Sequence, residues 1–222
     1  MMNHRRRQTV VLIHGLWMNG LEMGVLGQRL RSLGYRTLTF RYPTVRAGIL
    51  ENASRLHDFI EDVVFKMIDG GPPPHLVCHS LGGMVALNML EGHPKLAVGR
   101  VVALGTPFLG SQAARHLADW SIGRLALGNC MEGAMAGNGL QRVPSGREVG
   151  IIAGALPIGL SRLVLGVQGE SDGTVAVEET RLPGAKEHIT LRAVHVGLVF
   201  SPETARLVHR FLSLGTFGVE GS

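Results

Sequence analysis

The chain has 222 residues, of which 45% are hydrophobic and 18% charged, with 31 glycines and a formal net charge of +5. This length and composition favour one globular domain and exclude a disordered chain, a coiled coil or a collagen-like fibre. The positive charge comes without zinc-ligand spacing or interleaved basic and aromatic residues, so we expect no nucleic-acid partner, no metal and no cofactor.

Features that would direct the chain out of the cytoplasm are weak. Two cysteines, Cys78 and Cys130, do not make a disulfide framework. The basic start of the chain resembles a secretion signal, but the apolar run that follows, Thr9 to Ile13, is too short for one. A longer apolar region, 149–167, is interrupted by Pro157 and Arg162. We therefore expect a cytoplasmic protein with no stable membrane insertion, and its oligomeric state stays open.

Apolar runs alternate with helical patterns along the whole chain. Strands are expected at 9–13, 36–42, in the run that ends at Ser80, and at 100–104, 149–153 and 189–194. Helices are expected at 21–33, 49–68, 81–91 and 202–214, with looser helical text from Gln112 to Gln141. Continuous aliphatic strands separated by helices are typical of a parallel sheet covered on both faces. The sequence therefore predicts a single α/β domain over 1–222 with a mostly parallel sheet of about six strands.

The central feature is the stretch from Pro74 to Gly83, which contains Cys-His-Ser-Leu-Gly. A short apolar run ends at Ser80, and a helical pattern of small residues starts at once. This arrangement is typical of a nucleophile elbow, where a serine with positive φ is lifted above the sheet edge. The N–H of Leu81 would then lie at the start of a helix and favour a developing oxyanion. The alternative is a serine that only caps an ordinary helix.

Two later residues, Asp172 and His195, complete a possible set of catalytic side chains in the order serine, acid, histidine. Asp172 lies in the tight loop from Gly169 to Val175, where a carboxylate at a strand end could orient a base, although an isolated Asp-Gly also suits a plain turn. Glu170 is the reserve candidate. His195 directly follows the predicted strand at 189–194 and could reach across the sheet edge to Ser80.

Five motifs occur in an order that resembles the α/β-hydrolase superfamily, in particular its small lipases and esterases. They are His14-Gly15-Leu16, Cys78-His79-Ser80-Leu81-Gly82-Gly83, Leu104-Gly105-Thr106-Pro107-Phe108-Leu109-Gly110-Ser111, Ser171-Asp172-Gly173-Thr174-Val175 and Val194-His195-Val196-Gly197-Leu198.

The resemblance implies an α/β-hydrolase fold and a role for each matching residue. Ser80 would be the nucleophile, His195 the base and acid, and Asp172 the orienting carboxylate. The N–H groups of Leu16 and Leu81 would form the oxyanion hole, and His14 would be structural. Cys78 stands where the usual pattern has glycine, and we expect it to be a buried, inert thiol.

Substrate contacts are expected from apolar residues on loops above the sheet, although these residues could equally serve loop packing. The candidates are Trp17, Met18, Phe108, Leu109, Val175 and Leu198. The segment 112–141 lies where relatives carry a cap, and its loose pattern predicts a short cap with a small or absent lid.

These features predict a serine carboxylic-ester hydrolase that acts on apolar acyl esters, either small molecules or lipids, through an acyl-enzyme. An acyltransferase or a thioesterase would use the same three side chains, so both remain alternatives. A binding protein on a hydrolase scaffold is a third alternative, disfavoured by the complete set of catalytic residue types.

Overall fold

A computed structural model describes residues 7–130, 135, 140, 142–156 and 167–218 of the chain. Its centre is a six-stranded sheet in the order β2-β1-β3-β4-β5-β6, with every neighbouring pair parallel. The strands are β1 (Thr9–Ile13), β2 (Arg36–Phe40), β3 (His75–His79), β4 (Val101–Leu104), β5 (Val149–Gly154) and β6 (Glu187–Leu191). The predicted α/β-hydrolase sheet of about six parallel strands is confirmed.

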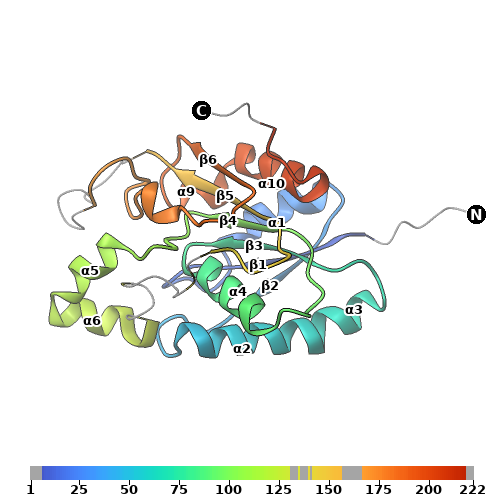
Figure 1. The fold of residues 1–222 in the computed structure, drawn as a ribbon, viewed down its shortest axis with the longest axis horizontal. Helices are drawn as coiled ribbons and strands as arrows, with labels where there is room; N and C mark the ends of the chain where they lie inside the picture. Colours follow the sequence, from blue (N-terminus) through green and yellow to red (C-terminus); the bar gives the residue numbers. More distant parts are fainter. Residues whose placement is uncertain (1–6, 131–134, 136–139, 141, 157–166, 219–222) are drawn as a thin grey trace, which may run out of the picture.

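Helices cover both faces of this sheet, as Figure 1 shows. One face carries α1 (Met23–Ser32), α9 (Gly197–Phe200) and α10 (Pro202–Leu214), and the opposite face carries α2 (Ile49–Phe59), α3 (Lys66–Ile68) and α4 (Leu81–Gly92). A π-helix, η1 (Ile60–Phe65), joins α2 to α3, and short 3₁₀ turns occupy Gly128–Cys130 and Glu178–Thr180.

Strand β1 shows how the core divides into two layers. Val11 and Ile13 point into the cluster under α2 and α4, whereas Val10 and Leu12 point into the cluster under α1 and α10. All four side chains are at most 1% exposed. Because successive side chains of a strand point to opposite faces, a strand covered on both sides must be apolar throughout. The continuous aliphatic runs in the sequence have this cause.

Several predicted boundaries were wrong by a few residues. Strand β2 ends at Phe40 rather than at 42, and β6 runs from Glu187 to Leu191 rather than from 189 to 194. The helix predicted over 49–68 contains the π-helix, whose wider turn shifts the side chains that face the core. Two apolar residues of this segment, Leu50 and Val63, are 69% and 46% exposed.

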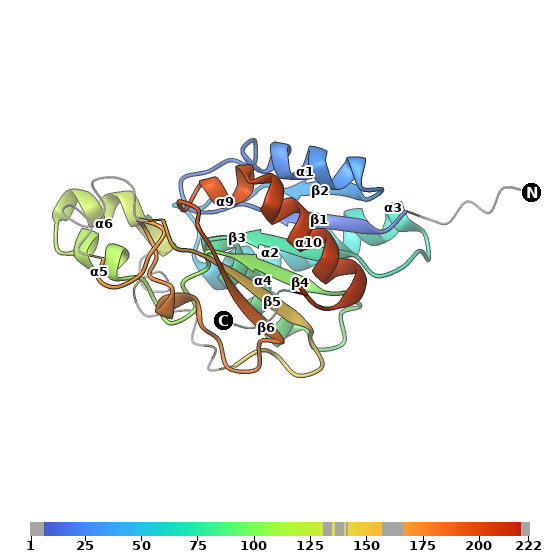
Figure 2. The ribbon, with the colours of Figure 1, turned by 90° about the horizontal axis from the view of Figure 1, so that it is seen from above.

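Two short helices, α5 (Gln112–Ala118) and α6 (Ser121–Leu127), extend beyond the carboxyl ends of the strands. Figure 2 shows this pair, which we call the cover, at the opposite end of the molecule from α3. The remainder of the predicted cap, at 131–134, 136–139 and 141, lies outside the described residues, as do Pro157 and Arg162. Among the described residues, no helix is long and apolar enough to cross a membrane.

Candidate active site

Ser80 occupies the sharp turn between β3 and α4. Its backbone has φ 53° and ψ −124°, a conformation that costs a non-glycine residue about 1–3 kcal/mol. The turn is held because the Ser80 N–H donates to the Leu104 carbonyl at 2.9 Å, and the Thr106 hydroxyl donates to the Ser80 carbonyl at 2.9 Å. Such strain persists only where surrounding contacts fix it, and strain of this kind clusters at functional sites.

Close packing around the turn demands glycine on both sides of it. A Cβ on Gly82 would lie 2.6 Å from the carbonyl oxygens of Ile13 and His14, and one on Gly15 would lie 3.0 Å from Ser80 Cβ. The distance at Gly82 is too short for any side chain, whereas the one at Gly15 is a tight contact that would push Ser80 by a few tenths of an ångström.

Cys78 replaces the usual upstream glycine without crowding Ser80. Its side chain is fully buried in the cluster under α2 and α4, two residues before the turn and on the sheet side of it. Burial raises the pKa of the Cys78 thiol, so it is a thiol rather than a thiolate at neutral pH. The geometry fits the expected buried thiol.

Asp172 and His195 form a buried pair at the end of the sheet. The Asp172 side chain is 1% exposed and that of His195 10%, and the Nδ1 atom of His195 lies 2.6 Å from Asp172 Oδ2. The backbone N–H of His195 also donates to the backbone carbonyl of Asp172 at 2.9 Å. A carboxylate at Nδ1 places the proton there and leaves Nε2 free to accept one. The reserve candidate, Glu170, is exposed.

The other carboxylate oxygen of Asp172 holds its own loop. Oδ1 accepts from the N–H groups of Thr174 at 2.9 Å and Val175 at 2.8 Å, an arrangement typical of Asx turns. The contacts of the turn and the contact to His195 therefore use different oxygens of one side chain, so the two interpretations weighed from the sequence are compatible. Gly105, with φ +56°, makes room for the pair, because its Cβ would lie 3.1 Å from His195 Nδ1.

His79, which we did not single out from the sequence, contacts both the backbone carbonyl and the ring of His195. Nε2 of His79 lies 3.2 Å from the His195 carbonyl oxygen, and the two rings are 4.7 Å apart. Burial, followed by the charge of His195, lowers the pKa of His79 to about 3. The ring therefore stays neutral at physiological pH. Its position directly before the elbow serine was the available signal.

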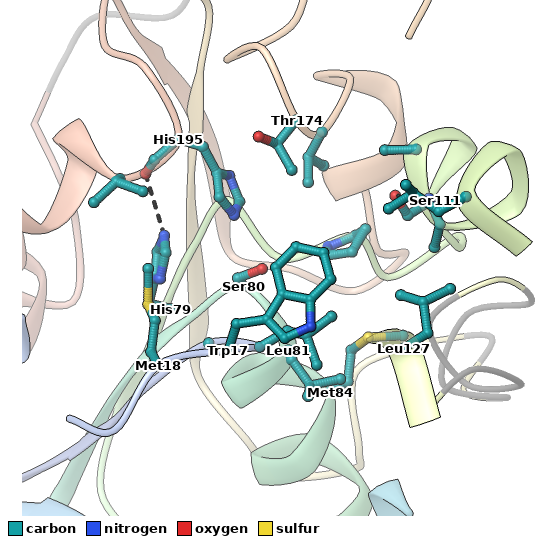
Figure 3. Close-up of a pocket in the computed structure, with 18 residues that line it drawn as sticks. Trp17, Met18, His79, Ser80, Leu81, Met84, Ser111, Leu127, Thr174 and His195 are labelled. Atoms are coloured by element: carbon teal, nitrogen blue, oxygen red, sulfur yellow. Dashed lines mark hydrogen bonds between the residues drawn. The ribbon is translucent and has the colours of Figure 1, made fainter. Parts of the chain in front are cut away.

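An apolar cavity of about 340 Å³ opens above Ser80 (Figure 3). It lies between the cover and the carboxyl ends of the strands, which we call the sheet edge. Ser80, His79 and His195 line it together, with Leu16 and Leu81 beside them. The figure shows Ser80 beneath the imidazole of His195, with Met84 and Leu127 farther along the cavity. This volume lies within the range of small-molecule sites, which begins at about 300 Å³.

Three of the six predicted substrate contacts line this cavity, namely Trp17, Met18 and Val175. The other three are corrected. Phe108 and Leu198 are at most 1% exposed and belong to the core clusters on opposite faces of the sheet, whereas Leu109 points to the surface and is 54% exposed. Side-chain direction on a loop follows its local turns, which the sequence pattern does not reveal.

The loop after β1 brings Leu16 to the cavity through a fixed turn. His14 is buried and stacks on Tyr42 with ring centroids 4.4 Å apart, and the Tyr42 hydroxyl donates to the His14 carbonyl at 2.7 Å. Burial lowers the pKa of His14, so it is neutral at physiological pH. Trp17 adopts φ +59°, and its N–H donates to the Thr44 hydroxyl at 3.2 Å. These contacts give His14 a packing role in the loop.

A family model described as the alpha/beta hydrolase family matches residues 10–200. The chain belongs to that family. Bacillus licheniformis lipase BlEst2 has the same fold: its mature form has a TM-score of 0.77 at 19% identity, over 95% of this chain and 93% of that one. The propeptide form has a TM-score of 0.83 at 20% identity, over 98% of this chain and 52% of that one.

Two other proteins extend the comparison. The metagenomic carboxyl esterase MGS0156 has a TM-score of 0.69 at 19% identity, over 94% of this chain and 76% of that one. RutD of Yersinia enterocolitica, whose name gives carbamate hydrolysis as a provisional activity, is 32% identical over 120 residues, 51% of this chain and 41% of RutD. The match with this chain therefore spans less than half the length of that curated relative.

Proposed function

We propose that this protein is a serine carboxylic-ester hydrolase that acts on apolar acyl esters through Ser80, His195 and Asp172. One observation carries the proposal: a serine held at positive φ and a histidine bound to a buried carboxylate line the same apolar cavity. This combination would supply a nucleophile, a base and an orienting group for acyl transfer within one cavity.

In the proposed reaction the Ser80 hydroxyl oxygen attacks the ester carbonyl carbon while its proton passes to His195 Nε2. Asp172 Oδ2 stabilises the imidazolium through the 2.6 Å contact to Nδ1. The N–H of Leu81, in the first turn of α4, and that of Leu16 would bind the oxyanion. His195 then returns the proton to the leaving alcohol. Water then attacks the acyl carbon while His195 takes its proton, and the bond to the Ser80 oxygen breaks as that oxygen receives the proton from His195.

The substrate class follows from the cavity wall. Met84 of α4, Leu117 of α5, Leu127 of α6 and Val175 line it, the last from the loop 169–177, which we call the acid loop. None of the described residues that line the cavity is an aspartate, glutamate, lysine or arginine. A charged acyl group would lose its hydration there without gaining a partner, whereas an aliphatic chain is stabilised by about 0.8 kcal/mol per buried methylene. Apolar acyl esters therefore fit best.

The decisive experiment is hydrolysis of p-nitrophenyl esters of increasing acyl length by the wild type and by Ser80→Ala. We expect turnover that rises with chain length until the cavity is filled. We also expect Ser80→Ala to lower kcat by about 10⁶-fold, as for the serine of other triads. Ser54→Ala, at an exposed serine of α2, is the matched control and should match the wild type.

A fluorophosphonate probe separates the remaining alternatives. Labelling of Ser80 in the wild type together with ester turnover supports the proposal. Labelling with no turnover until an alcohol acceptor or a thioester is supplied would favour the acyltransferase or the thioesterase. A folded protein that neither reacts with the probe nor turns over any ester would contradict the proposal and favour a binding role.

A further inference from the structure

Glu179 is a buried carboxylate that the proposed reaction does not use. Its side chain is 7% exposed, and it lies seven residues after Asp172, in the 3₁₀ turn Glu178–Thr180. Ionised carboxylates are rarely buried unless hydrogen-bond donors or cations surround them. The donors around Glu179 therefore indicate which parts of the structure it holds together.

Those donors come from the two segments that carry this part of the cavity wall. Oε1 accepts from the Gln112 N–H at 2.6 Å, at the first residue of α5, and Oε2 accepts from the Ala176 N–H at 2.8 Å, in the acid loop. The Arg115 guanidinium of α5 lies 3.6 Å from Oε1. The backbone carbonyl of Glu179 also accepts from the Leu109 N–H at 3.0 Å. One residue thus joins the cover to the acid loop.

The two joined segments form adjacent parts of the cavity wall. Ala113, Ala114 and Leu117 of α5 line the cavity, as do Thr174 and Val175 of the acid loop, and Ala113 packs in one buried cluster with Ala176. The catalytic end of the acid loop has separate support, because Asp172 Oδ1 holds the N–H groups of Thr174 and Val175. Loss of the Glu179 contacts would therefore loosen the cavity wall while the Asp172–His195 pair keeps its own hydrogen bonds.

We propose that Glu179 is a positioning residue that sets acyl-chain specificity by fixing the α5 wall of the cavity against the acid loop. The inference rests on the proposed ester hydrolysis and concerns the same cavity. A short acyl group reacts at Ser80 without reaching the α5 wall, whereas a long one must pack against it. The Glu179 contacts should therefore matter for long acyl chains and not for short ones.

The test compares kcat and KM for p-nitrophenyl octanoate and p-nitrophenyl acetate in Glu179→Gln. Glutamine retains one acceptor oxygen, so one of the two N–H groups faces an amide NH₂ instead of a carboxylate. A hydrogen bond to a charged acceptor is worth enough that its loss should lower the octanoate-to-acetate ratio of kcat/KM about tenfold. The loss should come from KM for octanoate, with kcat for acetate within about twofold of the wild type.

A second variant reaches the same contact from the cover. Gln112→Pro removes the N–H that Oε1 accepts, at the first position of α5, where proline suits a helix and the extended Ser111 before it suits a proline. It should lower the ratio as Glu179→Gln does. Gln112→Ala is its control, because it keeps the N–H and loses only the side-chain contact to the Gln168 N–H. Glu178→Gln controls for charge, because that side chain is 76% exposed.

The outcomes separate this inference from the proposed function. A lowered ratio in both Glu179→Gln and Gln112→Pro, with both controls at the wild-type ratio, supports the positioning role. Equal losses for both esters, an unchanged ratio, or the same loss in the controls would overturn it. If the wild type hydrolyses neither ester, the proposed function fails by itself.

Binding in the absence of turnover then decides the role of Glu179. The probe is 11-(dansylamino)undecanoic acid, and its fluorescence reports binding to the Ser80→Ala protein with and without Glu179→Gln. Weaker binding of about tenfold in the double variant supports a role in the cavity wall. Equal binding by the two proteins would overturn it.

Discussion

The sheet edge and the cover, which face each other across the cavity, are built in different ways. At the sheet edge, Ser80 and His195 are fixed by parallel strands, by hydrogen bonds between backbones and by glycines that let backbones approach closely. The cover consists of two seven-residue helices and exposes Leu125 at 79%. Among the described residues, its polar contacts include hydrogen bonds of Trp17 with Ala126 and of Gln112 with Glu179.

This difference separates the contacts that fix the reacting groups from the contacts that fit the acyl chain. Dense backbone packing at the sheet edge fixes the positions of the proposed catalytic groups, and even one added methyl group there, as at Gly82, would disturb them. The cavity wall on the cover depends on individual hydrogen bonds, each worth about 1 kcal/mol. Changes at the sheet edge should therefore affect the reaction itself, and changes at the cover should affect which acyl chain reacts.

After the loss expected for Ser80→Ala, the largest expected effect at the sheet edge comes from Asp172→Asn. Asparagine retains an oxygen for the N–H groups of Thr174 and Val175, so the loop keeps its turn. Its NH₂ group would face His195 Nδ1 and force the proton onto Nε2, the wrong tautomer for a base. We expect kcat for every ester to fall about 10⁴-fold with the thermal midpoint nearly unchanged.

Kinetics on the acetate and octanoate esters check this, with the exposed Asp58→Asn as control. A loss confined to the longer ester would contradict the division between sheet edge and cover, since it would place Asp172 among the residues that fit the acyl chain.

A smaller effect should appear as acid sensitivity of the sheet. His75, at the start of β3, is 8% exposed and accepts from the Arg100 N–H at 2.8 Å. Burial, aided by the charge of Arg100, lowers its pKa from 6.5 to about 4. Between these values the unfolded chain binds a proton that the folded chain does not. The contribution of neutral His75 to the free energy of unfolding is therefore complete above pH 6.5. It falls by about 1.4 kcal/mol per pH unit as the pH drops toward 4.

Urea unfolding at several pH values measures this slope. His75→Gln, which keeps a neutral acceptor, should flatten it by the contribution of one proton. If the slope is the same in His75→Gln, the acid sensitivity does not come from His75 and this prediction is wrong.

The smallest effect is expected at the cover from Trp17→Phe. The indole N–H of Trp17 donates to the Ala126 carbonyl of α6 at 2.8 Å, and phenylalanine keeps a ring but loses this donor. We expect a loss of about 1 kcal/mol, which lowers Tm by roughly 2–4 °C in a chain of this size. Calorimetry checks it, with Trp120→Phe as the control that should change Tm less. An equal shift in both would show that the contact does not hold the cover.

Much of the fold could be predicted because buried parallel strands leave a strong signal. Thr9 to Ile13 had to be apolar on both faces, and α10 begins at Pro202 and ends at Leu214, the limits that its cap and its periodicity predict. The boundary of β6 was missed because an edge strand is half-exposed and its pattern is weaker. The π-helix was missed because the apolar residues of that segment also fit an α-helix.

For the site, the sequence determined which residue types stand at strand ends, and therefore that Ser80, Asp172 and His195 lie at one edge of a parallel sheet. The tertiary structure alone decided which way loop side chains point: Val175 turns into the cavity, whereas Leu109 turns to solvent. It alone joined Glu179 to Gln112 across 67 residues. Strand order follows from local patterns and chain direction, but loop contacts depend on atoms that only folding brings together.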